Sequence, residues 1–308
     1  MQRIPSQSHP IVKATLNKLL PLMLSLDRVS SPQQLMEEGK DLDRIGRMIP
    51  LPAGVKKKAF FINHIECELL TPRKPKDGLL FYIHGGGYCV GSVESHRSLV
   101  GYLAKKLNRQ AIVFSYRKAP VHPFPAAIND ALEVYRWVLR QGYNPNEVVF
   151  AGDSAGGGMT LSLLKRNRDL GLPQPAAACC ISPWVDKTLS GDSMASNKAS
   201  ELVLSEGKLR LFADNYCGDV ARDNPKVSPL FGDFSDLPPT LFQVGASEIL
   251  LQDSVRAAEK MRADGGIAEL EVWDDMQHVW HYMYPLLKDA RLATAKMCDF
   301  FEAQLAIT

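Results

Sequence analysis

The chain has 308 residues, of which 45% are hydrophobic and 23% charged, a composition typical of a soluble globular protein with a sizeable core. Its 36 basic and 34 acidic residues give a formal net charge of +2. Because the two signs are interspersed, the sequence argues against a nucleic-acid partner and against stable association with an anionic membrane. The length fits one large α/β unit with an elaboration as well as it fits two domains.

The first fifty residues have a helical pattern and precede the first predicted strand. Within them, the apolar stretch 16–26 looks like the core of a signal peptide, but Lys18 and Pro21 interrupt it and no obvious small-residue cleavage site follows. We expect an amphipathic surface helix there, and no run in the chain reaches transmembrane length.

The cysteines show neither a Cys-x-x-Cys pair nor a zinc-like spacing. We therefore expect free thiols in a reducing compartment, no metal site and a cytoplasmic protein. The six are Cys67, Cys89, Cys179, Cys180, Cys217 and Cys298.

Short apolar runs typical of strands recur along the rest of the chain. They lie at 67–72, 79–83, 111–115, 148–152, 177–182, 240–244 and 270–273. Helical stretches separate most of them, at 95–108, 126–141, 155–168, 251–264 and 285–305. Strands that are apolar on both faces and alternate with helices predict an α/β fold with a mostly parallel central sheet flanked by helices.

Two regions break this alternation. The first is residues 1–50, and the second is an insertion at about 187–225 within the main domain, 51–308. Neither region is long enough to form an independent core. We interpret both as parts of a helical cap over the strand ends, where α/β sheets bind ligands. The alternative is that both are peripheral decoration.

The segment Gly152-Asp153-Ser154-Ala155-Gly156 lies between a predicted strand and a predicted helix. Between a strand and a helix, Gly-x-Ser-x-Gly indicates a sharp turn that lifts the serine out of the sheet. Such a turn leaves no room for side chains two residues to either side of the serine, which explains the two glycines. The N–H of Ala155, at the helix N-terminus, can face charge that develops on a group attacked by Ser154. Ser154 is therefore a candidate nucleophile.

A second glycine-rich segment, "YIHGGGY" at 82–88, follows another predicted strand. Its glycines leave backbone N–H groups unshielded, which suits the stabilisation of an oxyanion. A dinucleotide-binding loop fits less well, since Val90 stands where the fingerprint needs its third glycine, and no Gly-x-x-x-x-Gly-Lys-[Ser/Thr] sequence occurs. We expect Gly86 and Gly87 to donate to an oxyanion and Gly85 to shape the loop.

Three segments together resemble the hormone-sensitive-lipase family of α/β-hydrolase esterases. They are "HGGGY" at 84–88, "YRKAPVHPFPAAINDA" at 116–131 and "GDSAGG" at 152–157. The resemblance covers about residues 78–285 and implies an α/β-hydrolase fold with a helical cap. It also implies carboxylesterase activity on short- to medium-chain acyl esters. Lys118 and Val121 depart from the usual family sequence "YRLAPEHPFPAA", which affects local packing and removes no catalytic group.

A serine nucleophile needs a base within hydrogen-bond reach. In α/β-hydrolases the chain order is serine, acid, histidine, so His278 and His281 are the two candidate bases. We favour His278, because it lies in the loop after the strand 270–273 and matches the family pattern. We expect His281 to begin the final helix instead.

The candidate acids, Glu248 and Asp253, both follow the strand 240–244. We favour Glu248 because it lies at the strand end, where the resemblance to a glutamate-bearing branch of the family also places the acid. Either carboxylate can orient an imidazole and stabilise its positive form.

The expected mechanism is attack by Ser154 on a small-molecule ester, with His278 taking the proton and Glu248 holding the imidazole. No cofactor is required. We expect His84 to brace the glycine loop and Asp153 to be a structural partner. The same triad would serve an amidase, a peptidase or an arylformamide hydrolase, and plant gibberellin receptors resemble the family without a working histidine.

The resemblance also implies an oligomeric state. Relatives with this layout often dimerise through the last strand, which here is 270–273. A bare edge at that strand would be costly, so we expect a homodimer with twofold symmetry.

Overall fold

The computed structural model describes residues 1–23 and 31–307. Within them the chain forms one nine-stranded sheet in the order β1-β9-β8-β7-β6-β4-β5-β3-β2. The strands are β1 (Gln2–Ile4), β2 (Lys56–Ile62), β3 (Ile65–Thr71), β4 (Lys76–Ile83), β5 (Arg109–Ser115), β6 (Val148–Asp153), β7 (Ala177–Ile181), β8 (Thr240–Gly245) and β9 (Ala268–Trp273). Neighbouring strands are parallel except where they pair with β3. The predicted mostly parallel sheet is confirmed.

The seven apolar runs identified in the sequence all form strands, whereas β1 and β2 were not predicted. β2 begins with three exposed lysines at 56–58, which hide its strand character and protect a sheet edge from pairing with another chain. β1 has only three residues, too few to show a period. The expectation that residues 1–50 precede the first strand is therefore wrong.

The described residues form helices at the predicted places and in the two regions that interrupt the alternation. The helices are α1 (Pro10–Met23), α2 (Pro32–Met48), α3 (Val93–Leu107), α4 (Ala126–Arg140), α5 (Ala155–Asp169), α6 (Ser193–Ser196), α7 (Glu206–Cys217), α8 (Leu251–Ala263) and α9 (Lys288–Leu305). Of the apolar stretch 16–26, residues 16–23 lie in α1, where Leu16 is buried and Lys18 exposed. Residues 24–26 lie outside the described residues. No described helix combines the length and apolarity needed to span a bilayer.

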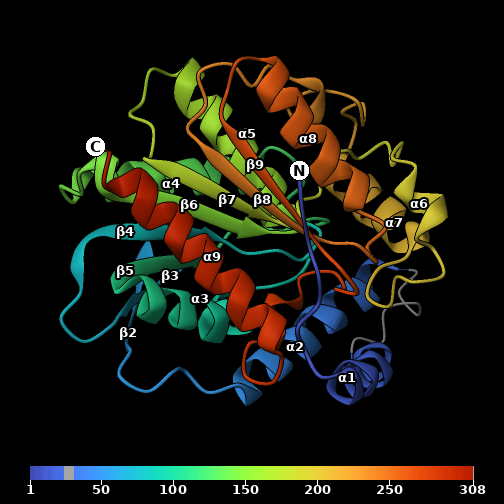
Figure 1. Ribbon diagram of the computed structural model, residues 1–308. Coiled ribbons are helices and arrows are strands. Elements are labelled where there is room, and N and C mark those ends of the chain that lie inside the picture. Colours follow the sequence, from blue (N-terminus) through green and yellow to red (C-terminus); the bar gives the residue numbers. More distant parts are fainter. Residues whose placement is uncertain (24–30, 308) are drawn as a thin grey trace.

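The helices cover the sheet on both faces, with α4, α5 and α8 on one side and α3 and α9 on the other (Figure 1). The period of two along each strand explains this arrangement. In β4, Leu79 and Phe81 belong to the hydrophobic cluster under α4, α5 and α8, while Leu80 and Tyr82 belong to the cluster under α3 and α9. Both faces of the strand are buried, as expected for a parallel sheet between two helical layers.

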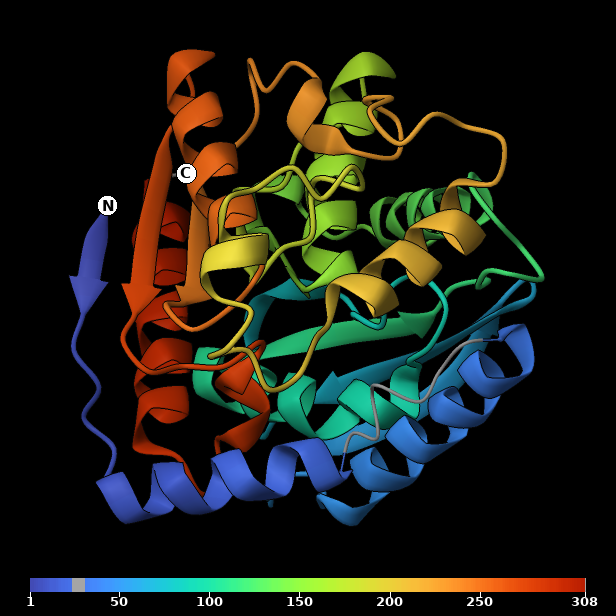
Figure 2. The ribbon, with the colours of Figure 1, turned by 90° about the vertical axis from the view of Figure 1, so that its right-hand side faces the viewer.

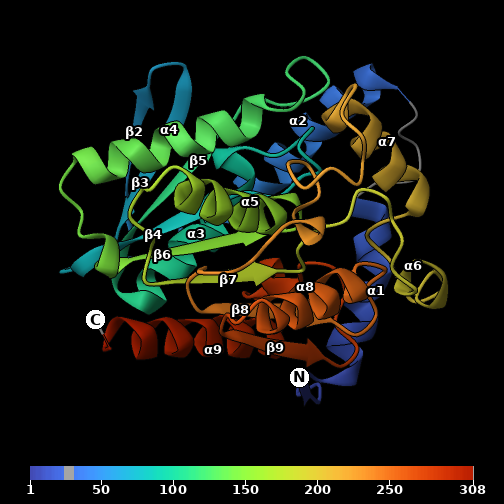
Figure 3. The ribbon, with the colours of Figure 1, turned by 90° about the horizontal axis from the view of Figure 1, so that it is seen from above.

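The remaining helices lie beyond the carboxyl ends of the parallel strands. Figure 3 shows the arrowheads of β6 and β7 pointing toward the side of the molecule that carries α1, α2, α6 and α7. Figure 2 looks onto this side, with α6 and α7 across the middle and α1 and α2 along the lower margin. The two regions that interrupt the sequence pattern thus both lie at the edge of the sheet where α/β proteins place their sites.

An N-terminal strap, defined here as residues 2–8, covers the outer edge of β9. β1 pairs with β9 in parallel, so the strand 270–273 is not the bare sheet edge that the sequence suggested. The carboxylate of Asp289, at the start of α9, accepts hydrogen bonds from Ser6 Oγ at 2.8 Å, Gln7 N at 2.8 Å and Ser8 N at 3.0 Å. One fully buried carboxylate therefore fastens the strap to the last helix.

We predict that Asp289→Ala lowers the free energy of unfolding by about 1–3 kcal/mol, because it leaves three donors without their acceptor. Urea denaturation followed by circular dichroism measures the change. Asp299→Ala, at an exposed position of the same helix, is the matched control and should change stability little. Equal stability of the two variants would contradict this role of Asp289.

Candidate active site

Ser154 occupies the turn between β6 and α5, in a backbone conformation that side chains rarely adopt, with φ of 52°. Two backbone hydrogen bonds hold the turn: Ser154 N donates to Ile181 O at 2.8 Å, and Trp184 N donates to Ser154 O at 2.9 Å. A Cβ at Gly156 would overlap the carbonyl oxygen of Ile83, and one at Gly152 would lie 2.5 Å from the Gly156 carbonyl oxygen. Close backbone approach on both sides therefore requires the two glycines.

The glycine loop after β4 runs beside this turn. Gly86 and Gly87 have φ of 111° and 61°, values that favour glycine. A Cβ at Gly87 would overlap the ring of Phe212, which reaches the loop from α7. The loop is thus packed between the sheet and the insertion, and its glycines are required by space as well as by conformation.

The backbone N–H groups of the glycine loop and the serine turn do not all have an acceptor. Gly85 N donates to Asp153 Oδ1 at 3.1 Å, so this N–H shapes the loop, and His96 Nε2 lies 3.2 Å from the same nitrogen. Among the described residues, no acceptor is found for the N–H groups of Gly86, Gly87 and Ala155. These are the three N–H groups that the sequence predicts as oxyanion donors.

Asp153 joins the glycine loop to the serine turn. Its carboxylate accepts from Tyr82 Oη at 2.9 Å and from the Gly85 N–H, and His96 Nε2 lies 3.3 Å away. Burial raises the pKa of Asp153, but the charge and hydrogen bond of His96 and the hydrogen bond of Tyr82 outweigh this, so the net pKa is lowered. His84 Nδ1 lies 2.7 Å from Gly85 O, the bracing contact expected from the sequence.

His278 and Glu248 form a buried pair, with His278 Nδ1 2.9 Å from Glu248 Oε2. The other carboxylate oxygen of Glu248 accepts from Ser182 Oγ at 2.7 Å and from Gly245 N at 2.6 Å. Ser182 Oγ also accepts from the N–H of Val279, at 3.3 Å. The role of Ser182 was not expected from the sequence, although its position directly after the strand next to β6 was a signal for it.

The electrostatics of this pair favour a basic imidazole. Burial lowers the pKa of His278. The hydrogen bond and charge of Glu248, together with the charges of Glu201 and Asp153, raise this pKa by more than burial lowers it. The net pKa therefore lies above its ordinary value. The serine turn and this pair are linked through the end of β7, where Ile181 O accepts from Ser154 N and the next residue, Ser182, contacts Glu248.

The alternative residues lie elsewhere. Asp253 Oδ2 accepts from the N–H groups of Val185 and Asp186, at 2.8 and 3.0 Å, and burial raises the pKa of this carboxyl to about 7. His281 Nε2 lies 2.9 Å from Gln243 Oε1, and burial lowers its pKa to about 3. Each has a structural partner of its own, and neither is hydrogen-bonded within the His278–Glu248 pair.

The first part of the insertion is attached to both loops of this pair. Asn197 Nδ2 donates to the backbone oxygen of Glu248 at 2.8 Å. Glu201 accepts from the N–H of the residue after Glu248, at 3.1 Å. Gln277 exchanges two hydrogen bonds with the backbone of the same segment, each at 3.0 Å. No spacing rule in the sequence indicated these contacts, because they join segments far apart in the chain.

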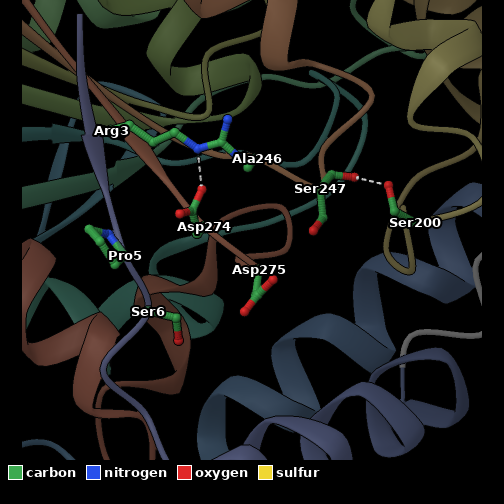
Figure 4. Close-up of a pocket in the computed structure, with 8 residues that line it drawn as sticks. All are labelled: Arg3, Pro5, Ser6, Ser200, Ala246, Ser247, Asp274 and Asp275. Atoms are coloured by element: carbon green, nitrogen blue, oxygen red, sulfur yellow. Dashed lines mark hydrogen bonds and ion pairs between the residues drawn. The ribbon is translucent and has the colours of Figure 1, made fainter.

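Two cavities lie near the pair. The larger, of about 570 Å³, opens at the surface beside the loops after β8 and β9 and is lined mainly by polar residues (Figure 4). Its lining is Arg3, Pro5, Ser6, Ser200, Ala246, Ser247, Asp274 and Asp275. The smaller, of about 30 Å³, lies between His278 and Leu16 and has room for roughly one or two waters. Ser154 lines neither of the two.

Sequence comparison shows the fold family of the chain and its relatives. The sequence model of a family described as having the alpha/beta hydrolase fold matches residues 80–282. The chain is similar to an acetyl-hydrolase of Streptomyces hygroscopicus, at 41% identity over 233 residues that cover 75% of this chain and 78% of the relative.

Solved structures show the same likeness over nearly the whole chain. EstE5, in a crystal soaked with p-nitrophenyl butyrate, matches with a TM-score of 0.91 at 34% identity and covers 97% of this chain and 99% of its own. An esterase from the bacterial hormone-sensitive lipase family matches with a TM-score of 0.91 at 31% identity, covering 96% of this chain and 99% of its own. The fold expected from the sequence is confirmed.

We predict that Asp153→Asn destabilises the protein at pH 7 by about 1.5–3 kcal/mol, since hydrogen bonds to a charged group are lost or weakened. The folded-state pKa of Asp153 is lowered, so its contribution is present above the unfolded pKa and disappears as pH falls. The difference between wild type and variant in urea denaturation should therefore shrink below about pH 4. Asp169→Asn, an exposed carboxylate at the end of α5, is the control and should show no such trend. A pH-independent difference would contradict the charged role.

Proposed function

We propose that this chain, which belongs to the hormone-sensitive-lipase family of α/β-hydrolase esterases, hydrolyses carboxylic esters through Ser154, His278 and Glu248. The observation that carries the proposal is the buried His278–Glu248 pair, 2.9 Å apart, beside a strained serine turn with unoccupied N–H donors. Nucleophile, base, orienting acid and oxyanion donors are the four parts that acyl transfer needs.

The chemistry follows from these parts. Ser154 Oγ attacks the ester carbonyl carbon while His278 Nε2 takes the hydroxyl proton, and the carbonyl oxygen becomes an oxyanion. Collapse of this intermediate expels the alcohol, which receives the proton from His278, and leaves an acyl group on Ser154. Water then attacks the acyl group with His278 again as base, releasing the acid and restoring the serine. Glu248 holds the imidazole at Nδ1 and stabilises its positive form throughout.

The oxyanion is stabilised by the N–H groups of Gly86, Gly87 and Ala155, which have no acceptor among the described residues. Donors already fixed by the glycine loop and by the first turn of α5 need no reorganisation when the charge appears. Gly85 shapes the loop and is not one of the three donors, because its N–H donates to Asp153. Every step uses groups of this chain and requires no cofactor.

The substrate class follows from the relatives and the cap. We assign the cap to about 187–225 and to the part of 1–50 that follows the strap, over a catalytic domain of 51–308 whose sheet β1 extends. Support comes from Phe212, whose ring packs on Gly87, and from Tyr216, which stacks on Tyr88 with ring centroids 3.7 Å apart. Bulky rings this close to the site favour short- to medium-chain acyl groups. The butyrate ester soaked into EstE5 is of this size.

Other reactions on the same triad, such as amide, peptide or arylformamide hydrolysis, use the same groups and are tested by comparing rates on matched ester and amide substrates. A receptor without catalysis is disfavoured by the His278–Glu248 contact. The homodimer and the cytoplasmic location stay predictions. Since β1 covers β9, a dimer on that side of the sheet would have to use β1 or the neighbouring helices.

We predict that Ser154→Ala lowers kcat for p-nitrophenyl butyrate by about 10⁴-fold or more, because the nucleophile is lost. A serine-directed fluorophosphonate should add one label to the wild type, detected by mass spectrometry, and none to the variant. Ser162→Ala, in the same helix, is the matched control and should keep both activity and labelling. Near-normal activity of Ser154→Ala would reject the proposed mechanism.

A second prediction separates the two carboxylates. Glu248→Gln removes the charge that supports the imidazolium, and a comparable change in a serine protease costs about 10⁴-fold in kcat. Asp253→Asn should cost far less activity, because Asp253 holds the backbone of Val185 and Asp186 and does not contact His278. Steady-state kinetics with thermal unfolding of both variants distinguishes lost activity from lost structure. An inactive Asp253→Asn with an active Glu248→Gln would reverse the assignment.

A further inference from the structure

Lys187, at the start of the insertion, is a completely buried lysine. Among the described residues no carboxylate lies within ion-pair distance of its ammonium group. The ammonium instead donates to Trp184 O at 2.8 Å and to Tyr88 Oη at 3.2 Å. It also lies 4.8 and 4.9 Å from the ring centres of these two residues.

Both partners of Lys187 belong to segments that form the active site. Trp184 N donates to the backbone oxygen of Ser154, so Trp184 is fixed to the serine turn. Tyr88 directly follows Gly87 and has a φ of 64°, which a residue with a side chain adopts only when its surroundings hold it there. Lys187 therefore connects the serine turn to the end of the glycine loop through two hydrogen bonds from one atom.

Stability does not explain a lysine at this place. Burial lowers the pKa of Lys187 to about 8, although interactions with Cys217, Asp253 and Asp186 act to raise it. A buried charge that lacks an ion-pair partner costs free energy, and an apolar side chain of similar length would fill the same space without that cost. The two aromatic faces and the carbonyl oxygen offset part of the cost.

We propose that Lys187 is a positioning residue that fixes the oxyanion donors of the glycine loop relative to the nucleophile. The proposal rests on the proposed esterase function. Loss of the connection releases Tyr88, and with it Gly87, from the serine turn, while the stacking of Tyr88 on Tyr216 keeps the loop folded. The donors then meet the developing oxyanion less well, although substrate still binds.

The test uses Lys187→Met and Tyr88→Phe in the full chain, with p-nitrophenyl butyrate as substrate. Each variant should lower kcat about tenfold with KM nearly unchanged, since small misplacements of catalytic groups cost up to about 10²-fold in rate. The double variant should lose no more than either single variant, because both remove the same connection. Lys187→Met should melt at the wild-type temperature or above it.

Lys165→Met is the matched control. Lys165 is also a buried lysine, lies near an aromatic ring (5.8 Å from the centre of Phe234) and belongs to α5, but has no partner in the site. This variant should keep the wild-type kcat. A fall in kcat equal to that of Lys187→Met would show a general effect of removing a buried lysine and would overturn the proposal.

Unchanged kcat in Lys187→Met and Tyr88→Phe, or additive losses in the double variant, would also overturn it. If Lys187→Met does not fold, Tyr88→Phe decides alone, since it removes only one oxygen. Fluorophosphonate labelling of wild type separates the two levels of inference. A labelled Ser154 with unaffected Lys187 and Tyr88 variants rejects only the positioning role, whereas an unlabelled Ser154 rejects the esterase mechanism itself.

Discussion

The end of β7 is the point on which the proposed catalytic geometry depends. The carbonyl oxygen of Ile181 accepts from Ser154 N, and the next residue, Ser182, donates to Glu248 and accepts from the N–H after His278. The serine turn, the acid loop and the histidine loop come from three different strands, and two adjacent residues hold them in register. A parallel sheet makes this possible because the carboxyl ends of neighbouring strands meet at one edge.

Close packing then fixes the glycine loop against the same edge. Asp153 binds the Gly85 N–H from the serine turn, and Phe212 closes over Gly87 from the insertion. Since no side chain fits at these glycines, the loop presents backbone N–H groups rather than side chains to the site. Because packing holds the glycine loop rigid, its N–H groups are preorganised as donors for an oxyanion.

The regions outside the regular α/β alternation contribute to the same site from two directions. The insertion binds the acid loop through Asn197 and the histidine loop through the backbone of Ser200, which accepts from Gln277. It also supplies Lys187 beside the glycine loop. The N-terminal strap covers β9 and is fastened to α9 by Asp289. The insertion therefore contacts the loops of both His278 and Glu248, and the strap contacts the loop of His278 at Asp274. Neither region carries a proposed catalytic group.

The sequence by itself determined the alternating α/β architecture, the serine turn and the glycine loop, because each depends on local patterns: apolar runs of strand length, and glycines spaced around Ser154. It did not determine β1, since three residues carry no period, nor that Glu248 rather than Asp253 contacts His278, since both follow the same strand. The roles of Ser182 and Lys187 also came only with the tertiary structure. Their partners are distant in the chain, and only folding of the sheet and the insertion decides which polar groups share a buried space.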